Sequence, residues 1–145
     1  MSPDLPSHDF NLRARAARTV AAVLKGANLD DALAAHTPGL TAPDASLLKA
    51  LAYGVVREQR LLEALTSQLL QKPLRDEPEV AALLACGLYQ LRSMRVPPHA
   101  AVGETVAAAA GLDKPWAKGL INAVLRRYQR EQAAIDGALP VTAGI

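Results

Sequence analysis

The stretch Lys118–Tyr128 reads KGLINAVLRRY and gives the strongest structural signal in the chain. Its apolar residues recur with a period of about 3.6 residues, which gathers them on one side of an α-helix. These residues are Leu120, Ile121, Val124 and Leu125. Two arginines, Arg126 and Arg127, follow towards the end of the helix, where the helix dipole favours positive charge. The stretch therefore predicts an amphipathic helix that carries cations near its C-terminus.

Two further stretches precede it, namely GLYQL at Gly87–Leu91 and PPHAAVGETV at Pro97–Val106. In this order and at this spacing, the three stretches resemble the NusB-like RNA-binding domain. The resemblance covers about residues 11–131. The AYGVVR and HAAVGETV segments are most like the version that opens the 16S ribosomal RNA cytosine-5 methyltransferases of the RsmB (Sun) type. The resemblance implies a compact all-α bundle of about seven helices that binds ribosomal RNA.

Methyltransferases of that family continue into a Rossmann-like half with a glycine-rich loop for S-adenosylmethionine and two cysteines. This 145-residue sequence has one cysteine, Cys86, and no G-x-G-x-x-G motif after a strand. We therefore expect no methyl transfer and no cofactor in this chain alone. The S-adenosylmethionine would belong to a catalytic domain joined in cis.

Composition supports a single all-α domain. Half of the residues are hydrophobic and only 3% are aromatic, and alanine and leucine dominate, which favours helix over sheet. Cys86 lies in an apolar run and is expected to be a buried thiol. The three histidines lack the spacing of metal ligands, so neither a metal site nor a catalytic residue is expected. With no secretion signal and no bilayer-length apolar stretch, the sequence predicts a cytoplasmic protein without a membrane partner.

We expect the chain to divide into three parts: a disordered N-terminus at 1–10, the NusB-like domain at 11–131, and a flexible tail or the start of a linker to a catalytic domain at 132–145. Periodicity, glycines and prolines predict the helices inside the domain. A threonine cap at Thr41, with Pro43 in the first turn, marks the start of the third. The first two helices are expected at about 11–25 and 29–36, and the third from Thr41 through Val55. A fourth is expected through 61–69, ended by Pro73, and the last three at about 80–91, 99–110 and 114–131.

The net charge of +2 is small, but its distribution is uneven. Residues 13–25 and 114–130 contain cations and no acid, which is typical of an electrostatic footprint for RNA. Arg15 and Arg18 are expected to share an exposed face without a nearby acid, whereas Arg13 points towards the apolar side. The resemblance gives the first helix the RNA-contacting role; the last helix either extends that surface or faces the catalytic domain. The candidate RNA-binding residues are Arg13, Arg15, Arg18, Lys25, Lys118, Arg126, Arg127 and Arg130.

Aromatic residues and helical glycines are interpreted as packing features. Tyr53 and Tyr89 are expected in the core, and Trp116 is expected to pack in the core in preference to stacking on a base. Glycine costs up to about 1 kcal/mol against alanine inside a helix. The glycines at 87, 103 and 119 therefore predict close approach between helices.

Two other functions stay open. One is a NusB-type transcription antitermination factor that joins RNA to a ribosomal protein. The other is a helical protein–protein adaptor or a homodimer, in which helix faces meet other helices and not RNA.

Overall fold

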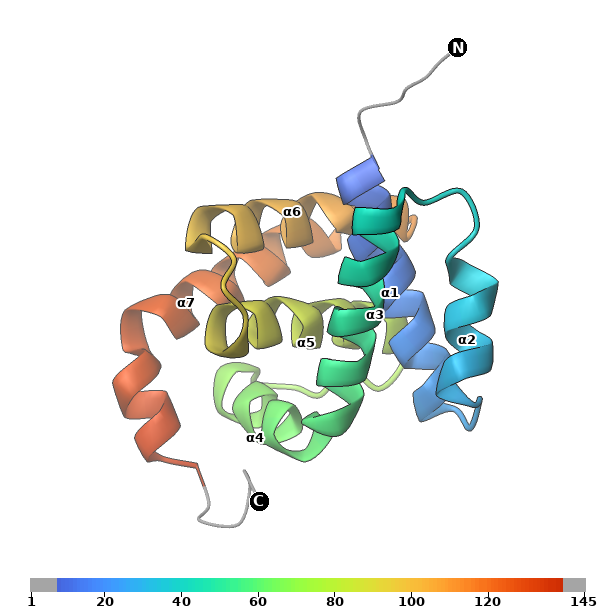
Figure 1. Ribbon diagram of the computed structural model, residues 1–145. Coiled ribbons are helices and arrows are strands. Elements are labelled where there is room, and N and C mark those ends of the chain that lie inside the picture. Colours follow the sequence, from blue (N-terminus) through green and yellow to red (C-terminus); the bar gives the residue numbers. More distant parts are fainter. Residues whose placement is uncertain (1–7, 140–145) are drawn as a thin grey trace.

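The computed structural model describes residues 8–139 of the chain. It contains seven helices and, over that range, no strand, which confirms the predicted all-α class (Figure 1). The helices are α1 (His8–Leu24), α2 (Leu29–His36), α3 (Ala42–Arg57), α4 (Gln59–Leu69), α5 (Pro78–Ser93), α6 (Pro98–Gly111) and α7 (Ala117–Gly137). Within the same range, no helix has the length and apolarity needed to cross a bilayer.

Both ends of the domain are more helical than the sequence predicted. Residues 8–10 belong to α1, although they were expected to be disordered, and residues 1–7 lie outside the described part. At the other end, α7 extends to Gly137, well into the expected tail. Its backbone leaves helical geometry at Glu131, where φ is −115° and ψ is 19°, and then resumes. The predicted boundary is therefore a kink within a longer helix, and residues 140–145 lie outside the described part.

Helix ends follow local chemistry. The side chain of Asn28 accepts a hydrogen bond from the amide of Asp31 and caps α2. The Thr41 hydroxyl caps α3 in the same way, as its sequence predicted, by accepting from the amide of Asp44. Gly26 follows α1 with φ of +113°, a left-handed conformation that glycine adopts without strain.

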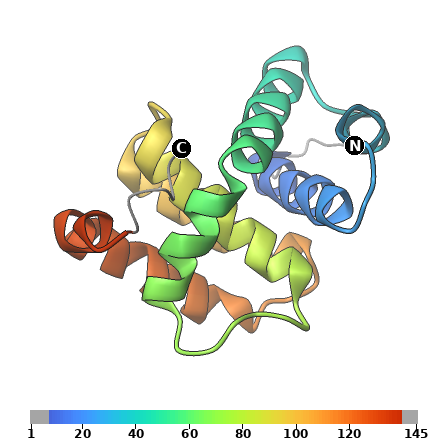
Figure 2. The same ribbon diagram turned by 90° about the horizontal axis from the view of Figure 1, so that it is seen from below.

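The helix α5 lies in the middle of the bundle, as its apolar circumference predicted, and contacts α1, α3, α4, α6 and α7. Seen from below, α1, α2 and α3 form one group, and α4 to α7 form the other (Figure 2). The helix α1 joins the two groups because it packs on α2 and α3 as well as on α5 and α6. Every side chain between Leu12 and Ala21 is at least half-buried, so this helix lies inside the bundle and not on its surface.

Close packing explains some of the helical glycines but not all of them. A Cβ at Gly87 would lie 2.8 Å from a methyl group of Leu125 in α7, so the predicted close approach between helices is confirmed there. The same prediction is wrong at Gly103 and Gly119, where a Cβ would meet nothing within 4 Å. The tightest site is Gly54, whose Cβ would lie 2.1 Å from the ring of Tyr89.

The aromatic residues divide between the core and the surface. Tyr89 is buried, as predicted, and Tyr128 is the largest fully buried side chain. The core prediction is wrong for Tyr53, which is 37% exposed and donates its hydroxyl to Asp30. It is also wrong for Trp116, which is 55% exposed. Periodicity placed both residues near apolar neighbours, but the packing of the other helices leaves both side chains exposed.

Candidate nucleic-acid interface

Arg13 is the most deeply buried of the predicted RNA contacts, with only 4% of its surface exposed. Its Nε donates a hydrogen bond to Oε1 of Gln90 at 3.0 Å. The amide nitrogen of Gln90 in turn donates to the hydroxyl of Thr105 and to the carbonyl of Cys86. This network joins α1, α5 and α6 through the core. Arg13 therefore has the packing role that its direction on the helix allowed, and it cannot reach a phosphate without leaving the core.

Arg15 fastens the end of α2. Its Nη1 donates hydrogen bonds to the carbonyls of His36, at 3.0 Å, and Pro38, at 2.6 Å. The last carbonyls of a helix lack partners within the helix, and a guanidinium is a suitable donor for them. The side chain is half-buried as a result, so Arg15 is not on the open face that the sequence predicted.

Arg18 binds the C-terminal end of α6 in the same way as Arg15 binds that of α2. Its Nη2 donates to the carbonyl of Gly111, the last residue of that helix, at 2.9 Å. Its Nε lies 3.9 Å from a carboxylate oxygen of Glu79, so the prediction that no acid is nearby is wrong. Spacing along one helix could not show that α2 and α6 would cover this face. Lys25, just beyond the end of α1, is exposed.

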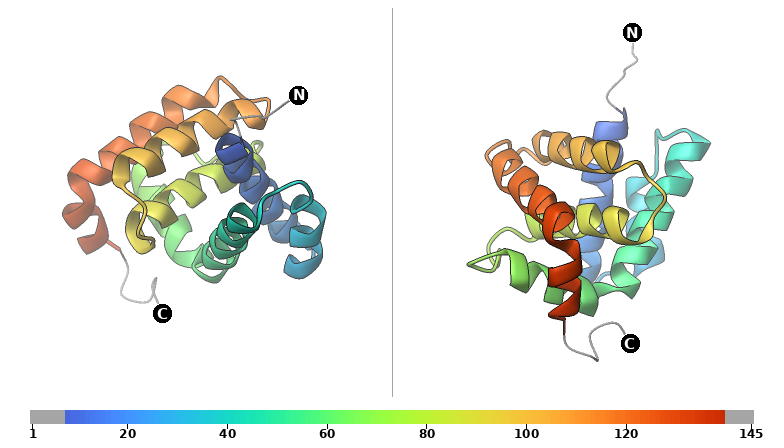
Figure 3. Two further views of the ribbon diagram at one scale, coloured as in Figure 1. Left: turned by 45° about the horizontal axis from the view of Figure 1, so that its top comes forward. Right: turned by 90° about the vertical axis from the view of Figure 1, so that its left-hand side faces the viewer.

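The exposed cations of α7 are Lys118, Arg126, Arg127 and Arg130, here called the α7 face. At about 100° per residue, Arg126 and Arg130 lie opposite the buried residues of the helix. In the right-hand view of Figure 3, α7 lies at the front of the molecule. All four predicted cations of this helix are thus exposed, and Arg126 and Arg130 point directly away from the core.

Two of these arginines have partners on their own helix. The Nε of Arg126 donates to the side-chain oxygen of Asn122 at 3.2 Å, and Arg127 pairs with Glu131 at 3.4 Å. Such exposed pairs contribute little to stability and leave most of the guanidinium accessible. Arg130 makes no ion pair with any described residue. The α7 face can therefore meet phosphates at a small cost in desolvation.

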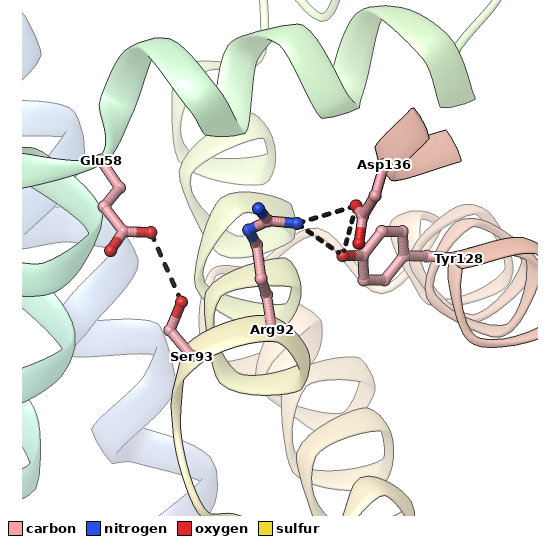
Figure 4. A network of polar contacts seen from close by, with 5 residues as sticks. All are labelled: Glu58, Arg92, Ser93, Tyr128 and Asp136. Carbon is pink, nitrogen blue, oxygen red and sulfur yellow. Dashed lines mark hydrogen bonds and ion pairs between the residues drawn. The ribbon is translucent and has the colours of Figure 1, made fainter. Parts of the chain in front are cut away.

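The end of α7 is anchored by a polar cluster shown in Figure 4. Arg92, near the end of α5, donates to a carboxylate oxygen of Asp136 at 2.8 Å and to the hydroxyl of Tyr128 at 3.3 Å. That hydroxyl donates to the same oxygen at 3.0 Å. Burial, followed by the hydrogen bond to Asp136, raises the pKa of Tyr128. The cluster holds α7 in place beyond its kink.

A second group of arginines was not predicted from the sequence. Arg57, Arg60 and Arg92 line a polar pocket of about 1000 Å³ between the α3–α4 junction and the ends of α5 and α7. Acids share this pocket, because Glu58 and Asp136 also line it. Acid-free runs of sequence do not reveal such a set, since its members come from separate helices.

Cys86 is fully buried, as predicted. Burial raises the pKa of its thiol to about 12, and the positive charge of Arg13 offsets only part of that effect. A thiol with this pKa is protonated at neutral pH and is a poor nucleophile. Among the described residues, no group of three His, Cys, Asp or Glu side chains is placed to hold a metal ion.

Comparison with known proteins places these features in a family. The NusB family model matches residues 11–130. The chain is 53% identical over 124 residues to ribosomal RNA small subunit methyltransferase B of Pseudomonas putida, covering 84% of this chain and 28% of the relative. It is 47% identical over 131 residues to the protein of the same name from Sodalis glossinidius, covering 87% of this chain and 30% of the relative. It is 45% identical over 129 residues to the protein of that name from Vibrio vulnificus, covering 88% of this chain and 30% of the relative.

The chain thus spans less than a third of the length of these relatives. Its resemblance to the NusB-like domain, inferred from three short stretches, is confirmed by the match over 11–130. The seven-helix bundle, with α5 at its centre, agrees with that assignment. The chain belongs to the NusB family.

Proposed function

We propose that this chain is an RNA-binding domain that helps a ribosomal RNA small subunit methyltransferase hold its substrate. The names of its relatives support the assignment to such an enzyme. Methyl transfer and S-adenosylmethionine binding would belong to the part of the relatives' length that this chain does not span. In this proposal the domain contributes affinity for RNA, and the rest of the protein contributes the chemistry.

The observation that carries the proposal is the α7 face. It presents four exposed cations, and residues 114–130 contain no acid. Most of the free energy of RNA binding comes from phosphate neutralisation with release of counterions. Arginine adds planar, bidentate contact with phosphate that lysine lacks. The arginines of α1 are less suited to this work because they hold neighbouring elements together.

The relatives favour this function over the two alternatives. A free-standing antitermination factor would also use a NusB-like bundle, but the relatives described above are named methyltransferases. A helical adaptor or homodimer would be expected to present an apolar face, whereas the exposed side of α7 is cationic.

The test is a salt titration of binding to a ribosomal RNA hairpin, with the wild type and the Arg126→Ala/Arg130→Ala double variant. The slope of log affinity against log salt should fall in magnitude by about 1–2 units in the variant. The matched control is Lys49→Ala/Lys72→Ala, which removes two exposed cations that lie outside α7 and outside the candidate RNA-binding set. Its slope should equal that of the wild type.

Two results would overturn parts of this proposal. If the wild type fails to bind RNA at low salt, the domain is not an RNA-binding module and the adaptor is favoured. If the control variant loses slope and the α7 variant does not, RNA binds to another part of the surface and not to α7.

A further inference from the structure

Trp116 is the most exposed of the large hydrophobic residues in the described chain, at 55%, ahead of Leu24 and Tyr53. Its backbone is nevertheless well held, with φ of −59° and ψ of −24°. The amides on either side are bonded as well: that of Ala117 donates to the carbonyl of Lys114, and that of Lys118 to the carbonyl of Pro115. The indole therefore projects from a hydrogen-bonded turn at the start of α7, with more than half of its surface exposed to solvent.

The indole and two of the cations lie on the same side of α7. At about 100° per residue, Trp116, Ala123 and Arg127 point in nearly the same direction, with Gly119 and Arg130 within a quarter turn. Gly119 is exposed, and a Cβ there would meet nothing within 4 Å, so no bulky side chain blocks the surface. At about 1.5 Å per residue, Arg127 and Arg130 lie about 16–21 Å along the axis from the indole.

The charge of this track is complementary to a nucleic acid. Between Ala117 and Arg130 the helix has no acid, and the acids that bound it, Asp113 and Glu131, lie at its two ends. Lys114, in the turn before the indole, is half-buried and pairs with Glu77 at 3.0 Å. The track therefore joins an aromatic plane at one end to a group of cations at the other.

We propose that Trp116 is a stacking platform for one base of single-stranded RNA, whose phosphates are then contacted by Arg127 and Arg130. The inference rests on the proposed function and adds the class of RNA that binds and the place where a base is held. An unpaired base can leave its own stack and lie on an exposed indole, which a base inside a duplex cannot do. Because every base has a π-face, the platform selects single strands over duplexes without selecting a sequence.

The chain contains one tryptophan, so tryptophan emission reports on this site alone. The experiment titrates the protein with a short single-stranded oligoribonucleotide of mixed sequence and follows tryptophan emission. The anisotropy of an end-labelled copy of the same RNA reports binding independently. The single strand should quench the emission in a saturable manner, at the same concentration that raises the anisotropy. A blunt RNA duplex of equal length should bind through its phosphates with little quenching.

Substitutions separate stacking from other effects. Trp116→Ala should weaken single-strand binding about 5- to 150-fold, equivalent to about 1–3 kcal/mol. Trp116→Phe should retain most of the affinity, because it keeps an aromatic plane. Tyr53→Ala is the matched control, since Tyr53 is also an exposed aromatic beside a cation, Lys49, but lies on α3. Its affinity should equal that of the wild type, and urea unfolding should show that every variant is folded.

The outcomes are distinguishable from those of the proposed function. If anisotropy shows binding while emission is unchanged, or if Trp116→Ala binds as tightly as the wild type, the stacking platform is wrong and RNA binding stands. Equal quenching by duplex and single strand would also overturn it. If anisotropy shows no binding at low salt, the proposed function itself fails.

Discussion

The guanidinium of Arg13 in α1 donates a 3.0 Å hydrogen bond to the side-chain oxygen of Gln90 in α5, and both residues are buried. The side-chain nitrogen of Gln90 donates a second hydrogen bond, to the hydroxyl of Thr105 in α6. Three helices from different parts of the chain are therefore tied together by one polar chain inside an apolar core. A buried polar group that loses its partner costs more than the bond contributes, so this link is sensitive to substitution.

Arg13→Ala is expected to lower the free energy of unfolding by about 2–3 kcal/mol, because it leaves the oxygen of Gln90 buried without its donor. Urea denaturation followed by circular dichroism measures the change. Lys25→Ala, an exposed position just beyond the same helix, should stay within about 0.5 kcal/mol of the wild type. Equal midpoints for the Arg13 variant and the wild type would contradict the network.

Two alanine substitutions at helical glycines should have opposite effects. Gly54→Ala should destabilise the fold by about 1–3 kcal/mol or more, because its Cβ would lie 2.1 Å from the ring of Tyr89. Gly103→Ala should be neutral or stabilise the fold by up to about 1 kcal/mol, since a Cβ there meets open space within α6. Thermal unfolding of the two variants checks the pair. A stabilising change at residue 54 would show that α3 and α5 are not so close.

Arg15→Ala should loosen α2, because its guanidinium binds the carbonyls of His36 and Pro38 at the end of that helix. Global stability should fall by only about 1 kcal/mol, since the side chain is half-exposed. Amide hydrogen exchange should therefore rise mainly in α2, as local opening becomes easier there. An unchanged exchange pattern in α2, with stability lost elsewhere, would exclude this fastening role.

Stability should fall in alkaline solution as the unfolded chain loses the proton of Cys86. Burial raises the pKa of this thiol from 9.0 to about 12 in the folded chain. Between these pH values Cys86 is ionised in the unfolded chain but not in the folded one. The contribution of this thiol to the free energy of unfolding is therefore complete below pH 9 and is lost as the pH rises towards 12. The free energy of unfolding should fall by about 4 kcal/mol by about pH 12 because of this thiol.

The measurement is the slope of unfolding free energy against pH, compared between the wild type and Cys86→Ala. The variant should show a flatter slope above pH 9, even though it starts from a lower stability because a core side chain has been shortened. Burial also raises the pKa of Tyr128, and this second alkaline effect should be present in both proteins. Parallel slopes would mean that the thiol ionises equally easily in the folded chain.

Local signals were enough to predict much of this fold. The bounds of α2, the threonine cap of α3 and the glycine after α1 each depend on residues a few positions apart, so the sequence alone specifies them. The burial of Cys86 and the central place of α5 followed from apolar residues all around one helix. The family resemblance followed from the order of three short stretches and is confirmed by the match over 11–130.

The fate of individual charged and aromatic side chains was decided only by tertiary structure. Arg15 and Arg18 lie on the polar side of an isolated helix, yet α2 and α6 pack there and offer carbonyls to both. Trp116 has apolar neighbours in sequence, yet the packing of the other helices leaves its side chain exposed. Helical periodicity fixes the direction in which a side chain points but not what stands in that direction. Contacts between distant segments, which no local pattern encodes, therefore turned α1 into an internal helix and left α7 as the open cationic surface.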